Sequence, residues 1–191
     1  MFRNYTPKRR SITRVVSSHR NHKADLKIDF HSRCGYCDSP DSWKITYYEI
    51  DHFIPEKILT IKTRTDYSNL VYSCRSCNNA KRKQWPTNDE NIPNANNEGF
   101  VDPCDDSYNS HFKRQTSGEI KYITKLGKWM YFAMKLHKPQ HQILWNIEAL
   151  REMIKEIEKL NNKLNSHPEV QNLLLETYRR FTAYVDGFRA L

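Results

Sequence analysis

Four cysteines in two closely spaced pairs are the residues of this chain best suited to hold a metal. Cys34 and Cys37 form the first CxxC pair, Cys74 and Cys77 form the second, and 36 residues lie between the pairs. Four thiolates give Zn²⁺ a closed tetrahedral site, which is structural rather than catalytic. The gap exceeds that of a minimal zinc ribbon, so we expect a hairpin to lie between the pairs and the metal to contribute to folding.

A histidine with a neighbouring carboxylate, and two asparagines, lie inside this frame or next to it. Asp51-His52 precedes Phe-Ile-Pro, Asn69 precedes Leu-Val, and Asn78 directly follows the second cysteine pair. Histidine titrates at about pH 6.5, so a neutral imidazole can accept a proton from water near neutral pH. A single histidine is more often an ordinary surface or core residue. Its position relative to the asparagines and the cysteines favours a catalytic role here.

The strands and helices that must position these residues are predicted from residue composition and from the prolines and glycines that end regular structure. Residues 43–50 are rich in β-branched and aromatic types and predict a strand, after which Pro55 ends regular pairing. Residues 69–73 predict a second strand, and residues 75–84 predict a helix that Pro86 stops. Proline, glycine and asparagine predict a loop at 86–104. Further along the chain, apolar periodicity and prolines predict three helices, at 119–137, 141–165 and 168–189.

The chain of 191 residues has a formal net charge of +9, which favours polyanionic partners such as nucleic acid. Residues 1–33 contain nine basic and two acidic side chains, so most of the surplus lies in this segment. It is either a basic arm that grips phosphates or a solvated N-terminal helix that packs on the core. We expect three parts: this arm, a domain at 34–118, and a helical region at 119–191 packed on that domain.

No stretch approaches the roughly 18 apolar residues of a membrane span, and no secretory signal is visible. Paired cysteines fit bound metal in a reducing compartment better than a disulfide framework. We therefore expect a cytoplasmic protein without a membrane partner.

The motif residues resemble the HNH endonuclease family, the ββα-metal nucleases. The family pattern is a CxxC pair, an acidic residue or His followed by His, two hydrophobic residues and Pro, then Asn-Leu-hydrophobic, then CxxC with Asn or His and a later Lys. The chain has each piece in order: Cys34–Cys37, Asp51–Pro55, Asn69–Val71 and Cys74–Lys81. The resemblance covers roughly residues 34–85 and implies a ββα-metal core. With the zinc site and the C-terminal helical region predicted from periodicity, we expect an α+β fold.

The resemblance also implies roles. His52 would be the general base, and Asp51 and Asn78 would hold a catalytic divalent ion, Mg²⁺ or another. Carboxylate and amide oxygens suit such a hard cation. Asn69 would brace the loop that bears the histidine, although an ordinary turn asparagine is the alternative. The last catalytic position is Asn78 rather than His, a replacement that keeps an oxygen ligand.

Four basic residues on or near the predicted 75–84 helix are candidates for nucleic-acid binding. Lys81 is three residues after Asn78, on the same helical face, and could meet the phosphate. Arg75, Arg82 and Lys83 add charge with no acid among them. The alternative is that these side chains are simply solvated.

The segment after Lys81 has looser markers, including Asp102-Pro103, His111-Phe112 and Gly118-Glu119-Ile120. It is similar to the PtuB-like HNH proteins of Septu-type and retron-linked anti-phage systems. That similarity implies a bacterial defence nuclease that works with an ABC-type ATPase docked on the C-terminal helices. The sequence leaves open the roles of four residues there: Asp102, Cys104, Asp106 and His111.

Three other functions remain open. A zinc-ribbon nucleic-acid-binding module without catalysis would explain the charge and the cysteines but not Asp51-His52 with Asn78. An enzyme of the same fold could cleave RNA, for instance a tRNA, because the same chemistry attacks any phosphodiester. A sequence-specific restriction enzyme has less support, since no recognition helix or added reading domain is visible.

Overall fold

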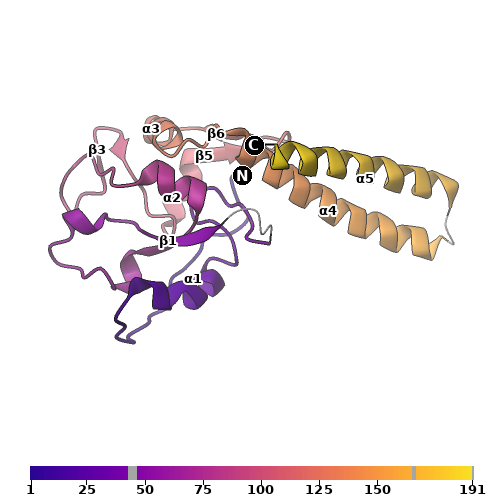
Figure 1. Cartoon of the computed structure of the whole chain (residues 1–191). Coiled ribbons are helices and arrows are strands. Elements are labelled where there is room, and N and C mark those ends of the chain that lie inside the picture. The colour runs from indigo at the N-terminus through magenta and orange to yellow at the C-terminus, as the bar shows by residue number, and fades with distance from the viewer. Residues whose placement is uncertain (43–46, 165–166, 191) are drawn as a thin grey trace. The chain divides into compact units, whose positions relative to one another are not determined.

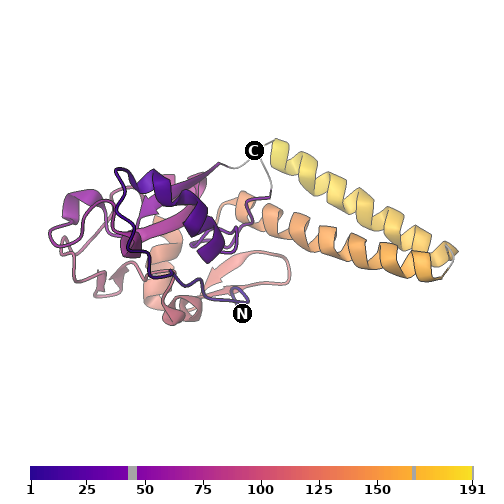
Figure 2. The same ribbon diagram turned by 90° about the horizontal axis from the view of Figure 1, so that it is seen from below.

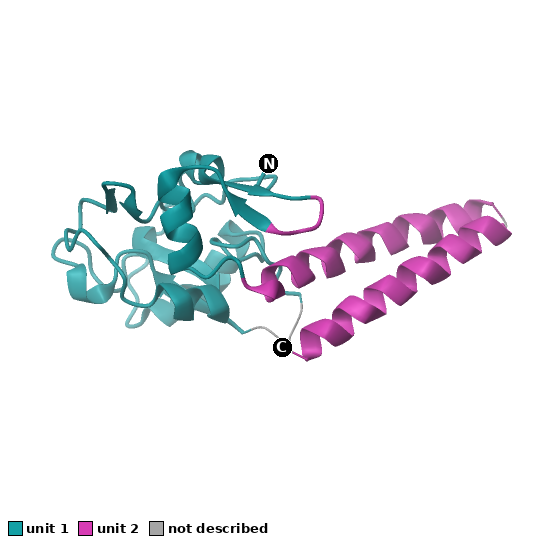
Figure 3. Cartoon of the chain, turned by 90° about the horizontal axis from the view of Figure 1, so that it is seen from above, with its two compact units in different colours: residues 1–115, 120–137 teal, residues 116–119, 138–191 magenta. Residues whose placement is uncertain are grey.

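The computed structural model describes residues 1–42, 47–164 and 167–190. It divides into two compact units (Figure 3), Met1–Gln115 with Ile120–His137, and Thr116–Glu119 with Lys138–Leu191. The division differs from the expected boundaries at residues 33 and 118. The N-terminal segment and residues 120–137 both belong to the first unit because they pack into its core.

The chain combines three two-stranded antiparallel sheets with five helices in the described residues (Figure 1), and the α+β fold class is confirmed. The helices are α1 Lys23–Asp29, α2 Arg75–Lys81, α3 Lys125–Ala133, α4 Pro139–Lys163 and α5 Pro168–Arg189. The strands are β1 Tyr48–His52, β2 Leu70–Cys74, β3 Asn94–Ala95, β4 Glu98–Gly99, β5 Phe112–Arg114 and β6 Ile120–Tyr122. Four 3₁₀ turns complete the described elements: η1 His19–His22, η2 Glu56–Ile58, η3 Tyr67–Asn69 and η4 Asp106–His111.

Strands β1 and β2 and helix α2 form a ββα unit. The two strands pair antiparallel, with Asp51 opposite Val71 and His52 opposite Leu70. Helix α2 begins at Arg75, directly after the last residue of β2. The predicted order of strand, loop, strand and helix is present. Strand β1 extends to residue 52 rather than 50, and residues 43–46 of the predicted strand lie outside the described residues.

Helix α2 ends three residues earlier than expected. Arg82 follows it with a φ of 48°, a left-handed conformation that stops the helix before Pro86 can. This early end places Arg82 and Lys83 in the following turn, where both are exposed.

The core of the first unit surrounds β2, which is buried along its whole length. Aromatic side chains from distant parts of the chain meet there, including Phe30 at the end of α1, Tyr36 between the first two cysteines and Tyr108. Phe2 joins them, with its ring centroid 5.4 Å from that of Phe112. The N-terminus is thereby fixed to the core.

The basic N-terminal segment packs on this core instead of extending from it (Figure 2). Arg3 is 3% exposed and donates to the carbonyl oxygens of Gly35 and Pro103 at 2.8 and 2.6 Å. Arg9 donates to Leu70 O at 2.6 Å and forms a two-pronged ion pair with Asp102. Of the two interpretations of residues 1–33, these contacts favour the packed segment, because the arginines are engaged by the protein's own acceptors.

The helix predicted at 119–137 is wrong in its first part. Residues Ile120–Tyr122 form strand β6, which pairs antiparallel with β5. Gly118 adopts a φ of 88° in the turn between them, a conformation that glycine takes without strain. Helix α3 begins only at Lys125, where the Oγ1 of Thr124 accepts the backbone N–H of Gly127.

Helices α4 and α5 of the second unit pack against each other as a helical hairpin. Both begin with proline at the first helical position, Pro139 and Pro168, where the missing N–H costs nothing. Helix α4 buries one stripe at three- and four-residue steps: Leu144, Ile147, Leu150, Ile154 and Ile157. Among the described residues, none of the helices combines the length and apolar character that crossing a membrane requires.

Candidate active site and metal centre

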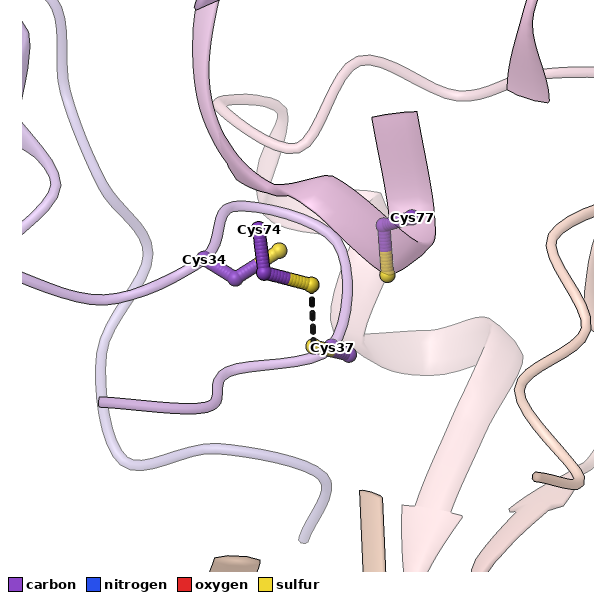
Figure 4. Close-up of side chains that lie close together, drawn as sticks. All are labelled: Cys34, Cys37, Cys74 and Cys77. Carbon is purple, nitrogen blue, oxygen red and sulfur yellow. Dashed lines mark hydrogen bonds between the residues drawn. The ribbon is translucent and has the colours of Figure 1, made fainter. Parts of the chain in front are cut away.

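Four cysteine thiols converge beside the ββα unit (Figure 4). Cys34 and Cys37 lie on the turn before β1, Cys74 ends β2, and Cys77 lies in α2. All four are buried, and their sulfurs lie within 4.8 Å of one another. Sulfurs bound to one Zn²⁺ at about 2.3 Å in a tetrahedron are about 3.8 Å apart, and the Sγ atoms of Cys37 and Cys74 are 3.8 Å apart. The thiol set can hold one metal ion and suggests zinc.

The surroundings of these thiols also fit a cation. The hydroxyl of Ser39 lies 3.2 Å from the Sγ of Cys37, and that of Ser73 lies 3.9 Å from the Sγ of Cys34. Hydrogen bonding to the Cys34 thiol, other thiol contacts and burial raise the pKa of Cys74 and Cys77 well above the usual range. Four buried thiolates repel one another, and a divalent ion removes that repulsion.

One face of β1 meets α2 through two side-chain pairs. Side chains two apart on a strand share a face, as do side chains three apart on a helix. Asn78 donates from its amide nitrogen to Glu49 Oε2 at 2.7 Å, and the Lys81 ammonium lies 3.0 Å from Asp51 Oδ2. Both expected metal ligands, Asp51 and Asn78, therefore lie at this strand–helix contact, each paired with a different residue.

Lys81 lies in the interior and not on the surface. It is 0% exposed, donates to the backbone oxygen of His52 at 2.8 Å, and lies 5.5 Å from the centroid of the Phe100 ring. Tyr36 also donates to Asp51 Oδ2, at 2.5 Å. In this geometry Lys81 neutralises Asp51 and does not reach a phosphate at the surface, which differs from the expectation for this lysine. The shared helical face was expected, but its orientation toward the core was not.

His52 lies on the other face of β1. Its Nε2 is 2.7 Å from the carbonyl oxygen of Arg64, and its Nδ1 is 3.5 Å from Glu56 Oε1. A carbonyl oxygen can only accept, so Nε2 carries the proton and Nδ1 carries the lone pair of the neutral ring. The protein thereby orients an imidazole whose Nδ1 is the proton acceptor.

Asn69 is hydrogen-bonded to the backbone that follows His52. It is 0% exposed; its Oδ1 accepts the backbone N–H of Ile54 at 2.8 Å, and its Nδ2 donates to Ile54 O at 3.0 Å. Its own carbonyl accepts the N–H of Phe53 at 2.8 Å. These three bonds fix the chain just after His52.

An open cleft of about 480 Å³ lies beside the histidine. Asp51, His52 and Pro55 line it together with Glu56, Lys57, Arg82 and Lys83. Two of the four predicted nucleic-acid-binding residues, Arg82 and Lys83, are thus at this cleft, and Lys57 adds a third cation that sequence reasoning missed. Arg75 is exposed but does not line this cleft.

His19 reaches the site from the N-terminal segment. Its ring is 4.7 Å from that of His52, edge to face. Burial, and the positive charge that His52 carries when protonated, lower the pKa of His19. His19, His52 and Glu56 each offer a donor atom within 4.8 Å of the others. No local sequence motif marks His19, because 32 positions separate it from His52 in the chain.

The four residues left open after Lys81 lie in local contacts. Asp102 pairs with Arg9 and accepts the backbone N–H of Cys104 at 2.8 Å, and Asp106 pairs with Lys8 at 2.9 Å. His111 Nδ1 lies 2.6 Å from Thr124 Oγ1. Burial raises the pKa of the Cys104 thiol to about 12. These contacts are those of turns and ion pairs, and none of the four lines the cleft beside His52.

The residues around Asn78 have the chemistry that a hard divalent ion prefers. Two carboxylates, Glu49 and Asp51, and one amide lie where β1 meets α2, and oxygen is the donor atom of Mg²⁺ sites. Because the amide nitrogen of Asn78 donates to Glu49, its oxygen is the donor available to an ion. The donor set fits such an ion, although Asp51 is already neutralised by Lys81.

The chain was compared with protein families, curated proteins and solved structures. Residues 34–84 match the family model described as HNH endonuclease, which spans all four cysteines and the ββα unit. No curated protein and no solved structure matches the chain. The match supports the HNH family for this part of the chain. Residues 34–84 therefore carry an HNH endonuclease domain, which supports a nuclease enzyme that binds nucleic acid.

Proposed function

We propose that the protein is a metal-dependent endonuclease that hydrolyses phosphodiester bonds of DNA. The observation that carries the proposal is the oriented imidazole of His52, whose Nε2–H is bound by Arg64 O at the edge of a cationic cleft. A zinc-ribbon binding module would not need an imidazole held in one tautomer. The HNH match at residues 34–84 supports the same conclusion.

The proposed reaction is attack by water on a phosphodiester held in the cleft: a new P–O bond forms, the P–O bond to one sugar breaks, and the leaving alkoxide takes a proton from solvent. His52 Nδ1 takes the proton of the attacking water, and the carbonyl of Arg64 stabilises the imidazolium that forms. Lys57, Arg82 and Lys83 attract and position the phosphates. Asn69 keeps the chain after the base in place.

A divalent ion completes the proposed site. Asp51 and Asn78 would hold it, with Glu49 as a third oxygen donor beside them. When bound, Mg²⁺ or another such ion supplies Lewis-acid stabilisation of the charge that develops on the phosphate oxygens. The buried pair of Lys81 and Asp51 then holds the Asp51 side chain of β1 against α2.

The test is cleavage of supercoiled plasmid and of total RNA by purified protein, with Mg²⁺ or with EDTA. We expect Mg²⁺-dependent nicking of the plasmid that falls at least about 100-fold in His52→Ala, the range for loss of a general base. The matched control is His167→Ala, which removes an exposed histidine of the second unit. A zinc assay and a melting curve establish that each variant keeps its fold.

The outcomes separate the candidate functions. Full turnover in His52→Ala would remove the assignment of the base. Cleavage of RNA but not of plasmid would show that RNA is the substrate, and the proposed mechanism would still apply. Binding of both nucleic acids, without cleavage in the presence of any divalent ion, would favour the non-catalytic zinc-ribbon binding module.

We also propose that the protein is a cytoplasmic anti-phage nuclease that works with an ABC-type ATPase docked on the α4–α5 hairpin. The sequence markers after Lys81 and the exposed apolar side chains Met153, Leu160 and Leu164, which lie on one face of the hairpin, support this. A Met153→Glu and Leu160→Glu double variant should fold, keep its basal nuclease activity and fail to copurify with the ATPase. Unchanged copurification would argue against this docking face.

A further inference from the structure

A second group of metal-binding side chains lies apart from the four cysteines. It consists of His19 from the N-terminal segment, His52 at the end of β1, and Glu56 at the start of η2. Their donor atoms lie within 4.8 Å of one another, and in the described part of the chain this is the one such group besides the cysteines. We propose that these three residues bind a divalent transition-metal ion such as Zn²⁺.

The distances suit a first-row ion. Two ligand atoms at about 2.1 Å from a tetrahedral ion lie about 3.4 Å apart. His52 Nδ1 and Glu56 Oε1 are 3.5 Å apart, close to that value. The side chain of Glu56 is 52% exposed, so it can rotate to close the remaining gap toward His19.

The hydrogen bond behind His52 has the form found behind ligating histidines. A metal-bound imidazole almost always donates its other ring N–H to a carboxylate, a carbonyl or water, which fixes the ring and strengthens the donor nitrogen. Here Nε2 donates to Arg64 O at 2.7 Å, and Nδ1, the nitrogen nearest to Glu56, carries the lone pair. The ring is therefore already set for a ligand on the Nδ1 side.

The donor set distinguishes this site from the other two. Two imidazoles and one carboxylate favour Zn²⁺, Co²⁺ or Ni²⁺ over Mg²⁺, whereas the oxygen donors of Asp51 and Asn78 favour Mg²⁺. The four cysteines offer sulfur alone. One chain can thus hold a structural zinc and a second zinc without either displacing a magnesium ion.

Occupation of this site has a consequence that rests on the proposed function. A metal bound to His52 Nδ1 uses the lone pair that would accept the proton from water. Zn²⁺ in excess of one ion per chain is then an inhibitor of cleavage, and it is the N-terminal segment, through His19, that makes the inhibition strong.

The experiment counts metal on the full chain. Protein carrying one zinc is dialysed against Co²⁺ or Zn²⁺, and bound metal is measured per chain for wild type, His19→Ala, Glu56→Gln and the control His167→Ala. We expect two ions per chain in wild type and in the control, and one in the other two at the same free metal concentration. The Co²⁺ bound in addition to the cysteine-site zinc should show d–d bands without thiolate charge-transfer bands.

Metal content tests the proposed metal site, and nuclease activity tests its link to the proposed function. One ion per chain in wild type, or two in His19→Ala with unchanged affinity, would overturn the metal site whatever the enzyme cleaves. If the second ion binds as expected, excess Zn²⁺ should inhibit wild-type cleavage with an inhibition constant at least about tenfold lower than for His19→Ala. Equal inhibition of both would sever the link between this site and the base.

Discussion

Replacement of Lys81 by methionine separates two roles for this lysine, a buried ion pair and a surface contact with phosphate. Methionine keeps the length of the side chain and removes its charge. In the structure Lys81 is 0% exposed and lies 3.0 Å from Asp51 Oδ2, whose side chain is 7% exposed. Removing one partner of such a pair leaves the other charge buried without compensation, which costs about 3–5 kcal/mol.

The expected result is a large loss of stability. For a protein of this size, 1 kcal/mol corresponds to about 2–4 °C in melting temperature, so Lys81→Met should melt roughly 6–20 °C lower. Lys83→Met is the matched control, because Lys83 is exposed and lines the cleft. That variant should change stability by less than about 0.5 kcal/mol and reduce the salt slope of nucleic-acid binding by about one.

Urea unfolding of four proteins measures the pair itself: wild type, Lys81→Met, Asp51→Asn and the double variant. We expect the double variant to lose less free energy of unfolding than the two single variants lose together, by at least about 1 kcal/mol, because it leaves no unpaired charge. If Lys81→Met had wild-type stability and a reduced salt slope of nucleic-acid binding like that of Lys83→Met, the buried pair would be refuted. Lys81 would then be a surface contact with phosphate.

Three further predictions concern the supports of the site. Asn69→Ala should lose about 2–4 kcal/mol in urea unfolding, because two backbone groups of Ile54 lose their buried partner, whereas the exposed Asn162→Ala should not. Cys74→Ser should lose zinc by metal assay and melt at a lower temperature; full zinc content with a normal melt would contradict the cysteine site. Glu90 accepts backbone N–H bonds from Thr60, Ile61 and Lys62, which lower its pKa to about 2 from 4.5. Its contribution is therefore complete above pH 4.5 and is lost as the pH falls toward 2, so the stability difference between wild type and Glu90→Gln should shrink below pH 4.5 and stay constant above it.

The elements of the ββα unit could be predicted because their signals are local. β-branched and aromatic residues marked both strands, and the second cysteine pair marked the start of α2. The segment 119–137 was mispredicted because Ile120–Tyr122 is a strand only through its pairing with residues 112–114. Pairing of that kind depends on tertiary contacts and leaves no period in so short a stretch.

Candidate site residues could be named from the sequence, but their geometry could not be predicted. The spacing of Asn78 and Lys81 placed both on one helical face, yet it did not tell whether that face meets solvent or β1. The charge of residues 1–33 was visible, but the internal acceptors of Arg3 and Arg9 lie about 30 to 100 positions away in the chain. His19 was missed for the same reason, since only folding brings it to His52.

Backbone contacts on both sides of the loop after His52 hold it in place, so we expect residues far from the cleft to affect the proposed catalysis. Asn69 clamps Ile54 two residues after the histidine, and Glu90 clamps the backbone of Thr60–Lys62. Between these clamps lies Glu56, and just beyond them lies Arg64, whose carbonyl fixes the His52 tautomer. Loosening either clamp should let the Arg64 carbonyl move away from Nε2, so the proton could shift to Nδ1 and block the base. Glu90→Gln should therefore lower turnover more than substrate affinity, although Glu90 does not line the cleft.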